Sequence, residues 1–301
     1  MKNEATWPID LGNAGVLVAG PWRRLRAILW ATLLFAGATA LFVATQRLGY
    51  WLHLPPSSQP AIVIGLPVLA FLVYAYVVRA AEKRAPIEVL PGAGTIVEIV
   101  AGAIISVVML CLIVALLWSL GLYQVKWNHL SHVFDSFLFD SYLSGMLEEL
   151  AFRAILLRLL ARAFGPRWGL VLSAALFGLA HITHGSLVPL LEVAVNAGLP
   201  LGLLYMVTGR LWMAVSMHTA WDFFEESFLG VNTHHGLLLS TPMPGRSAIL
   251  TGGSYGPDGS ILAMIVGILA CVAIQAASRR GYFQRTRAVQ DSRAQSELTS
   301  V

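Results

Sequence analysis

Long apolar runs alternate with short polar segments along almost the whole chain. A helix needs ~20 mostly apolar residues to cross a bilayer, and several segments of about this length meet that requirement. We expect membrane-spanning helices at residues 25–46, 60–80, 95–120, 135–161, 167–184, 187–207, 210–228 and 260–279. The pattern therefore predicts an all-α, polytopic integral membrane protein with about eight transmembrane helices.

The composition agrees with this pattern and excludes several other classes of protein. Hydrophobic residues make up 57% of the chain and charged residues 12%, whereas soluble domains carry about 25% charged residues. The two cysteines, Cys111 and Cys271, lie inside apolar runs, without the spacing of a metal site. An ordinary cytosolic enzyme, a disordered chain and a small disulfide scaffold are therefore excluded.

The basic residues predict the orientation of the helices. They flank the apolar runs, so we interpret the net charge of +4 as a membrane-orientation signal and expect no nucleic-acid partner. With the N-terminus inside, only Arg47, Lys126 and Arg246 fall on the outer side. Because basic residues favour the cytoplasmic side, we expect both termini to be cytoplasmic, in a multi-pass protein of the bacterial inner membrane.

The chain divides into four parts. Residues 1–24 are expected to form a cytoplasmic tail, and residues 25–133 three transmembrane helices with their connectors. Residues 134–279 form the core that carries the intramembrane charges, with an outer loop at 229–259. That loop is rich in Gly, Ser, Thr and Pro and predicts a lid or a disordered connector. The polar, basic residues 280–301 predict a disordered tail.

The fourth span carries two adjacent glutamates and an arginine. A charge at bilayer depth costs at least ~2.5 kcal/mol, so such residues are paired or functional. Glu149 and Arg153 are four residues apart, which predicts an ion pair on one helix face. Glu148 lies about 100° away around the helix and is left out of that pair. A free carboxylate beside an ion pair is suited to general-base catalysis.

The fifth and seventh spans carry histidines at helical spacing from a second residue. His181 shares a face with Phe177, and His218 shares a face with Asp222. An imidazole and a carboxylate together can activate water. Two imidazoles and a carboxylate can also bind zinc, and the zinc set would be His181, His218 and Glu148.

Four other polar residues of the sixth and seventh spans are interpreted as structural rather than catalytic. Glu192 and Asn196 share a face in the sixth span, where packing or water-lining is the preferred reading. Glu225 and Glu226 end the seventh span and are interpreted as interfacial charges.

Three motifs on three spans resemble one known family. E-E-x-x-x-R at Glu148, F-x-x-x-H at Phe177 and H-x-x-x-D at His218 follow one another in the order and spacing of the CPBP family. These are intramembrane proteases related to the type II CAAX prenyl endopeptidase, formerly called Abi proteins. The resemblance covers about residues 135–228 and leaves the first three spans and the tail uncovered.

The resemblance implies an intramembrane endopeptidase. In the family the first Glu and the His of the second motif activate water, which carries over to Glu148 and His181. The third motif stabilises the oxyanion, which carries over to His218 and Asp222, while Glu149 and Arg153 support the site. Members have been described both as metalloproteases and as metal-free enzymes; we favour no metal here, with zinc as the alternative. The expected substrate is a membrane-embedded or lipid-modified peptide or protein.

One departure from the family pattern concerns the third motif. Asp222 stands where Asn is common, and an ionised Asp cannot donate a hydrogen bond to an oxyanion. We expect a neutral, donating Asp222; the alternative is a carboxylate that fixes the tautomer of His218.

Two other functions are compatible with mid-membrane Glu, His and Asp residues. A transporter or proton relay also carries such residues, but the sequence contains no inverted repeat. A non-catalytic immunity or scaffold protein would keep the fold without the chemistry, but all three motifs are complete. The endopeptidase is therefore the leading hypothesis.

Overall fold

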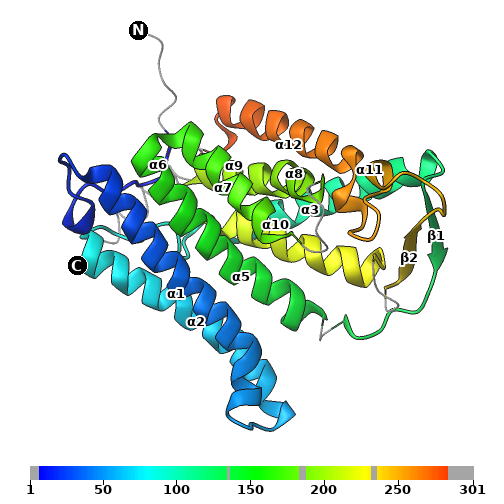
Figure 1. Cartoon of the computed structure of the whole chain (residues 1–301), viewed down its shortest axis with the longest axis horizontal. Coiled ribbons are helices and arrows are strands. Elements are labelled where there is room, and N and C mark those ends of the chain that lie inside the picture. The colour runs from blue at the N-terminus through cyan, green and yellow to red at the C-terminus, as the bar shows by residue number, and fades with distance from the viewer. Residues whose placement is uncertain (1–6, 134–135, 183–187, 232–235, 284–301) are drawn as a thin grey trace.

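The computed structural model describes residues 7–133, 136–182, 188–231 and 236–283. These residues form a helical bundle with one small sheet (Figure 1). The α-helices and strands are α1 (Arg23–Trp51), α2 (Gln59–Val77), α3 (Thr95–Ser119), β1 (Tyr123–Trp127), α5 (Leu143–Glu149), α6 (Arg158–Phe164), α7 (Pro166–Ala180), α8 (Val188–Val193), α9 (Leu199–Thr208), α10 (Trp212–Phe223), β2 (Leu238–Pro242), α11 (Ala248–Thr251) and α12 (Ile261–Arg279).

Short π-helical turns join several of these helices into longer ones. They are η3 (Val78–Glu82), η4 (Ser136–Tyr142), η5 (Leu150–Leu157), η6 (Ala194–Gly198) and η7 (Phe224–Phe228). The 3-10 turns are η1 (Gly15–Leu17), η2 (Pro56–Ser58) and η8 (Pro257–Gly259). Each expected span thus corresponds to one helical segment, and the all-α, polytopic fold is confirmed.

Five of these segments are long and apolar enough to cross a membrane. They are Arg23–Leu48, Gln59–Glu82, Thr95–Ser119, Leu190–Thr208 and Ile261–Arg279. The helix α7 has 15 residues and α10 has 12, both shorter than a full span requires. The count of eight spans, and the side of the membrane on which the termini lie, remain predictions.

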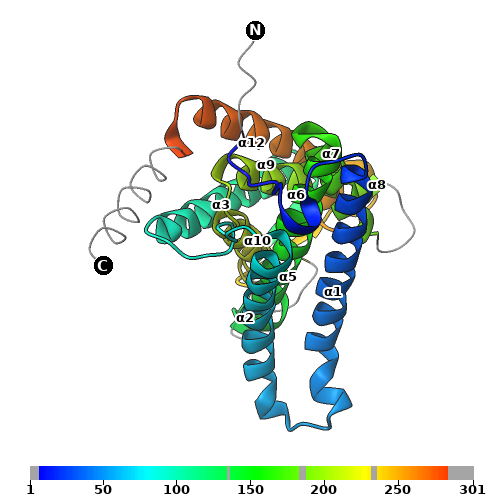
Figure 2. The same ribbon diagram turned by 90° about the vertical axis from the view of Figure 1, so that its left-hand side faces the viewer.

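The helices α1 and α2 form a hairpin that extends past the other helices (Figures 1 and 2). The two helices contact each other, and both pack on the segment from α5 to α6. Many of their outward side chains are exposed and apolar, for example Leu33 at 62% and Leu72 at 63%. An apolar exposed face suits contact with lipid.

The N-terminal tail packs against the bundle rather than lying free. Leu17 is buried, and Arg162 donates a hydrogen bond to its carbonyl at 2.8 Å. Gly15 lies so close to η3 that a Cβ there would fall 1.9 Å from the carbonyl oxygen of Ala81. The expected tail at residues 1–24 is therefore, from Trp7 on, part of the folded structure.

The end of the bundle at which α2 and α6 terminate is held by buried ion pairs. Arg158 is fully buried and bonds both oxygens of Glu82, at 2.8 and 2.7 Å. Arg84 bonds both oxygens of Glu88. Burial acts to raise the pKa of Glu88, but this bidentate contact with Arg84 lowers it below its usual value. The Arg158–Glu82 pair fixes the helical segment that carries the first motif against η3, which continues α2.

The two outer connectors pair with each other. The strands β1 and β2 are antiparallel, with Tyr123 opposite Pro242 and Trp127 opposite Leu238. The loop after β2 is also ordered where it is described, since Thr251 and Ser260 are buried. The expectation of a disordered connector is therefore wrong for residues 236–259, because this pairing and burial satisfy the backbone of the loop. The tail beyond residue 283 lies outside the described residues.

The helix α10 is packed closely between α3 and α5. A Cβ at Gly102 of α3 would lie 2.3 Å from the carbonyl oxygen of Met213, and one at Gly145 of α5 would lie 2.0 Å from the hydroxyl oxygen of Thr219. These contacts require glycine, and they bring the third motif beside the first.

Candidate active site

The three sequence motifs converge in space. Glu148 and Glu149 lie at the end of α5, His181 follows the last residue of α7, and His218 lies in the middle of α10. Rings from the second and third motifs pack together, since Phe177 lies 4.5 Å from His181 and 5.8 Å from His218 between ring centroids. The chain thus brings together residues up to 70 positions apart in sequence.

Glu148 faces His181. The carboxylate oxygen Oε2 of Glu148 lies 3.7 Å from Nε2 of His181, and the two side chains are 21% and 28% exposed. The other ring nitrogen, Nδ1, donates to the carbonyl oxygen of Phe177 at 2.8 Å, because a carbonyl can only accept. In the neutral imidazole Nε2 is then an acceptor directed towards Glu148. Oε2 of Glu148 is buried and forms no hydrogen bond within the described residues.

Glu149 has different partners. Its Oε1 accepts hydrogen bonds from Nη1 of Arg153 at 2.7 Å and from Nδ1 of His218 at 2.8 Å. Both Glu149 and Arg153 are almost fully buried, and the guanidinium lies 4.3 Å above the centre of the Phe177 ring. The ion pair expected from the four-residue spacing is present, and Glu149 also fixes the histidine of the third motif.

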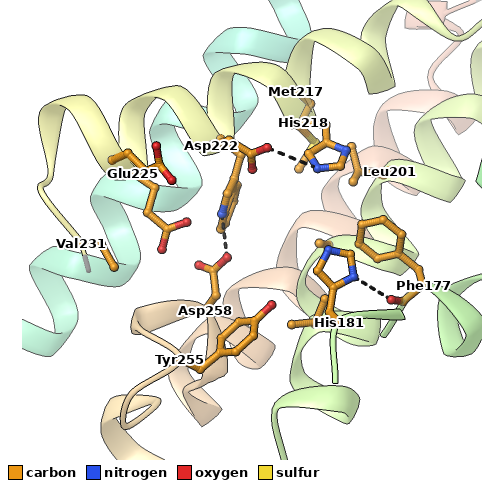
Figure 3. Close-up of a pocket in the computed structure, with 14 residues that line it drawn as sticks. Phe177, His181, Leu201, Met217, His218, Asp222, Glu225, Val231, Tyr255 and Asp258 are labelled. Carbon is orange, nitrogen blue, oxygen red and sulfur yellow. Dashed lines mark hydrogen bonds and ion pairs between the residues drawn. The ribbon is translucent and has the colours of Figure 1, made fainter. Parts of the chain in front are cut away.

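His218 is held between two carboxyl groups. Because Nδ1 donates to Glu149, Nε2 is the nitrogen that remains for other contacts, and it lies 3.6 Å from Oδ2 of Asp222 (Figure 3). The hydrogen bond that fixes the tautomer of His218 therefore comes from Glu149 rather than from Asp222. This contact was not foreseen from the sequence, because it joins helices whose relative register the motifs do not specify.

A cavity of about 200 Å³ opens beside these residues (Figure 3). His181, His218 and Asp222 line it together with apolar side chains from α7, η6, α9 and α10. The remaining polar lining residues come from η7 and from the outer loop: Glu225, Glu226, Tyr255 and Asp258. A cavity of this kind, with a few polar groups directed into it, is the usual form of a binding or active site.

Comparison with known proteins identifies the part of the chain that forms this site. The family described as type II CAAX prenyl endopeptidase Rce1-like matches residues 131–224. The chain contains an Rce1-like domain. All seven residues of the three motifs lie inside the matched region. No curated protein and no solved structure matches the chain.

The family that matches residues 131–224 is described as one of endopeptidases, in agreement with the resemblance drawn from the motifs. With its long apolar helices, the protein is an integral membrane protein. The matched region runs from the residues before α5 to η7 and leaves out α1–α3, the outer loop and α12. Several residues that line the cavity therefore lie outside it.

The outer loop contributes to the cavity through Asp258. The indole N–H of Trp221 donates to Oδ2 of Asp258 at 2.7 Å. The other oxygen, Oδ1, is buried without a hydrogen-bond partner in the described part of the chain. Burial raises the pKa of Asp258 to about 7, although the Trp221 hydrogen bond and the nearby His218 act to lower it.

Sequence reasoning missed this part of the site. Glu225 and Glu226 line the cavity, which their interpretation as interfacial charges did not include. Their spacing of three and four residues from Asp222 was the signal that could have found them. Asp258 and Tyr255 carried no such signal, because their position depends on how the loop folds.

The zinc alternative requires three donor side chains that are directed at one point. Within the described residues, no three His, Cys, Asp or Glu side chains are grouped so that they could hold a metal ion. His181 faces Glu148, whereas His218 is directed to Glu149 and Asp222. The three residues of the suggested zinc set therefore do not form a three-ligand site in this arrangement.

The sixth span contributes to the cavity with apolar residues only. Val193 and Ala197 line it, whereas Glu192 and Asn196 are buried and absent from its lining. Their interpretation as packing residues agrees with this placement. His184, another histidine of the fifth span, lies outside the described residues.

Proposed function

We propose that the protein is an intramembrane endopeptidase in which Glu148 and His181 activate the water that attacks a peptide bond. One contact carries the proposal: Oε2 of Glu148 lies 3.7 Å from Nε2 of His181. Two acceptors at this separation can contact one water molecule, each at about 2.8 Å. Glu149, the other glutamate of the motif, is engaged with Arg153 and His218 and is not available for this role.

The proposed reaction follows from these groups. Glu148 takes one proton of the water while the water oxygen forms a bond to the carbonyl carbon of the substrate. His181 orients the water through Nε2, with its own ring fixed by the hydrogen bond to Phe177. Glu148 then returns the proton to the amide nitrogen as the C–N bond breaks, which leaves a carboxylic acid and an amine.

We propose that His218, protonated on both ring nitrogens, and Asp222 stabilise the oxyanion of the tetrahedral intermediate; Nδ1 of His218 already donates to Glu149, so Nε2 needs a proton of its own to donate. Nε2 of His218 and the carboxyl of Asp222 lie on the same side of the cavity (Figure 3). Glu149 already fixes the orientation of the His218 ring through Nδ1, so Asp222 is not needed for that purpose. The contact therefore supports a donor role for Asp222. As a neutral acid, Asp222 can donate a hydrogen bond to the developing charge.

Substitutions of Asp222 test this role. Asp222→Asn should retain hydrolysis, because the amide also donates. Asp222→Ala should reduce kcat by ~10²–10³, the usual cost of losing one oxyanion donor. Steady-state hydrolysis of a peptide by the purified variants measures both. Equal damage from Asn and Ala would instead assign Asp222 a role as a carboxylate.

Chelation tests the metal-free form of the proposal. Extensive dialysis against a chelator should leave the rate of peptide hydrolysis unchanged, because the proposed base and the residue that orients the water are both side chains. Hydrolysis by the purified protein in proteoliposomes, with metal content measured on the same sample, is the experiment. Stoichiometric zinc, with activity that is lost on removal and restored on re-addition, would establish a metalloenzyme.

A further inference from the structure

Four exposed basic side chains lie at the end of the hairpin where α1 begins and η3 ends. Arg23 and Arg24 start α1, whereas Arg79 lies in η3 and Lys83 follows it directly. The indole N–H of Trp30 in α1 donates to a carboxylate oxygen of the last residue of η3 at 2.9 Å, so the two elements are in contact there. This end of the hairpin lies away from its tip (Figure 2). We call the four residues the basic patch.

The acidic residues near the basic patch are directed to other arginines. Glu82 is fully buried and bonds both Arg158 and Arg84. Glu88 is buried and bonds Arg84, and Asp10 lies 3.8 Å from the same guanidinium. The side chains of the basic patch form no hydrogen bond or ion pair with any residue that the structure describes. Four exposed charges of one sign therefore favour an anionic partner.

A stripe of exposed apolar side chains leads away from the basic patch along α1. Trp22, Leu25, Leu29 and Leu33 follow one another at spacings of three, four and four residues, and all four are exposed. This spacing places side chains on one face of a helix. The stripe begins at the level of the arginines and continues for about three turns.

The end of α2 repeats this arrangement. Leu72 and Tyr76 are exposed, and Arg79 and Lys83 follow Tyr76 at successive spacings of three and four residues. Exposed Trp and Tyr rings are typical of the level of the phospholipid headgroups. Basic residues at one end, with apolar stripes beyond them, match a ligand that has an anionic head and apolar chains.

We propose that the basic patch binds the phosphate of an anionic phospholipid, whose acyl chains lie along the exposed stripes of α1 and α2. The guanidinium groups of Arg23, Arg24 and Arg79 can each donate two hydrogen bonds to phosphate oxygens. A zwitterionic phospholipid carries the same phosphate together with a cation, which the patch repels. None of these residues lines the catalytic cavity, so the site is separate from the proposed function.

Lipid titration followed by native mass spectrometry tests this site. The full chain, delipidated in detergent, is titrated with phosphatidylglycerol or phosphatidylcholine that have the same acyl chains. We expect phosphatidylglycerol to bind at least ~10-fold more tightly, because each basic residue near an anionic headgroup contributes about fivefold in affinity. Glycerophosphoglycerol, the same headgroup without acyl chains, should not displace the lipid at equal concentration.

The test variant is Arg79→Gln/Lys83→Gly. The backbone of Lys83 has a φ of 56°, in the left-handed region that favours glycine, so the change removes a charge without straining the turn. Its preference for phosphatidylglycerol should fall at least ~5-fold. The matched control Arg279→Gln/Arg280→Gln removes two exposed charges at the end of α12, which packs mainly on α9, η6 and α3, and it should keep the preference. Thermal unfolding in phosphatidylcholine nanodiscs shows whether both variants are folded.

The two variants separate a local site from the general attraction of basic residues to anionic membranes. A preference that the patch variant loses and the control keeps supports the inference. A preference that both variants keep, or that both lose equally, overturns it. No preference in the wild-type protein overturns it as well, and displacement by glycerophosphoglycerol at equal concentration would show a site for a soluble anion instead.

Discussion

Replacing Glu148 by glutamine should reduce peptide hydrolysis by about 10²–10⁴-fold, the usual contribution of a general base. Glutamine keeps the size of the side chain but cannot take a proton from water. The fold should be preserved, because Glu148 is partly exposed and its Oε2 makes no hydrogen bond in the described part of the chain. Single-turnover hydrolysis by purified protein, together with its thermal unfolding, measures the two effects separately.

The matched control for this variant is Asp140→Asn. Asp140 lies on the same helical segment, in η4, whereas Glu148 is the residue whose carboxylate faces His181. The variant Asp140→Asn loses a carboxylate, as Glu148→Gln does, and should keep the wild-type rate of peptide hydrolysis. Hydrolysis at the wild-type rate by Glu148→Gln would remove Glu148 from the reaction.

Arg153→Met should lower the free energy of unfolding by about 3–5 kcal/mol, the cost of leaving a buried charge without its partner. Arg153 is only 1% exposed, bonds Glu149 and stacks on Phe177. Methionine keeps much of the apolar stem but leaves Glu149 with only the hydrogen bond from His218. Unfolding in mixed detergent, followed by tryptophan fluorescence, measures the change.

Two further variants make this prediction specific. Arg167→Met removes an exposed arginine of α7 and should change stability by less than about 0.5 kcal/mol. Glu149→Gln combined with Arg153→Met should recover part of the loss, because no unpaired charge remains. A loss for Arg153→Met no larger than that for Arg167→Met would show that the ion pair contributes nothing to stability.

The sequence predicted the helical segments and the motif residues because both are local. Apolar length identifies a helix, and a spacing of four residues places Glu149 beside Arg153. The sequence did not predict that Glu149 also bonds His218, since this contact depends on how closely α5 and α10 approach. Gly145, which permits that approach, is by itself only one glycine among 27.

The outer region was harder to predict for the same reason. The strands β1 and β2 are each five residues long and pair across more than 100 positions of sequence. No local pattern indicates such a partner. Asp258 reaches the cavity only because this region is folded, so its place beside Trp221 follows from tertiary structure alone.

The close packing of α10 has a consequence for how a substrate reaches the cavity. Contacts at Gly102 and Gly145 leave no space for α10 to slide towards α3 or α5, and moving it away would break the bond between His218 and Glu149. The wall formed by α10 is therefore the stationary side of the entrance. The opposite wall carries Tyr255 and Asp258, and the hydrogen bond from Trp221 to Asp258 joins it to α10. We expect access to be controlled there, by displacement of the loop rather than by separation of the helices.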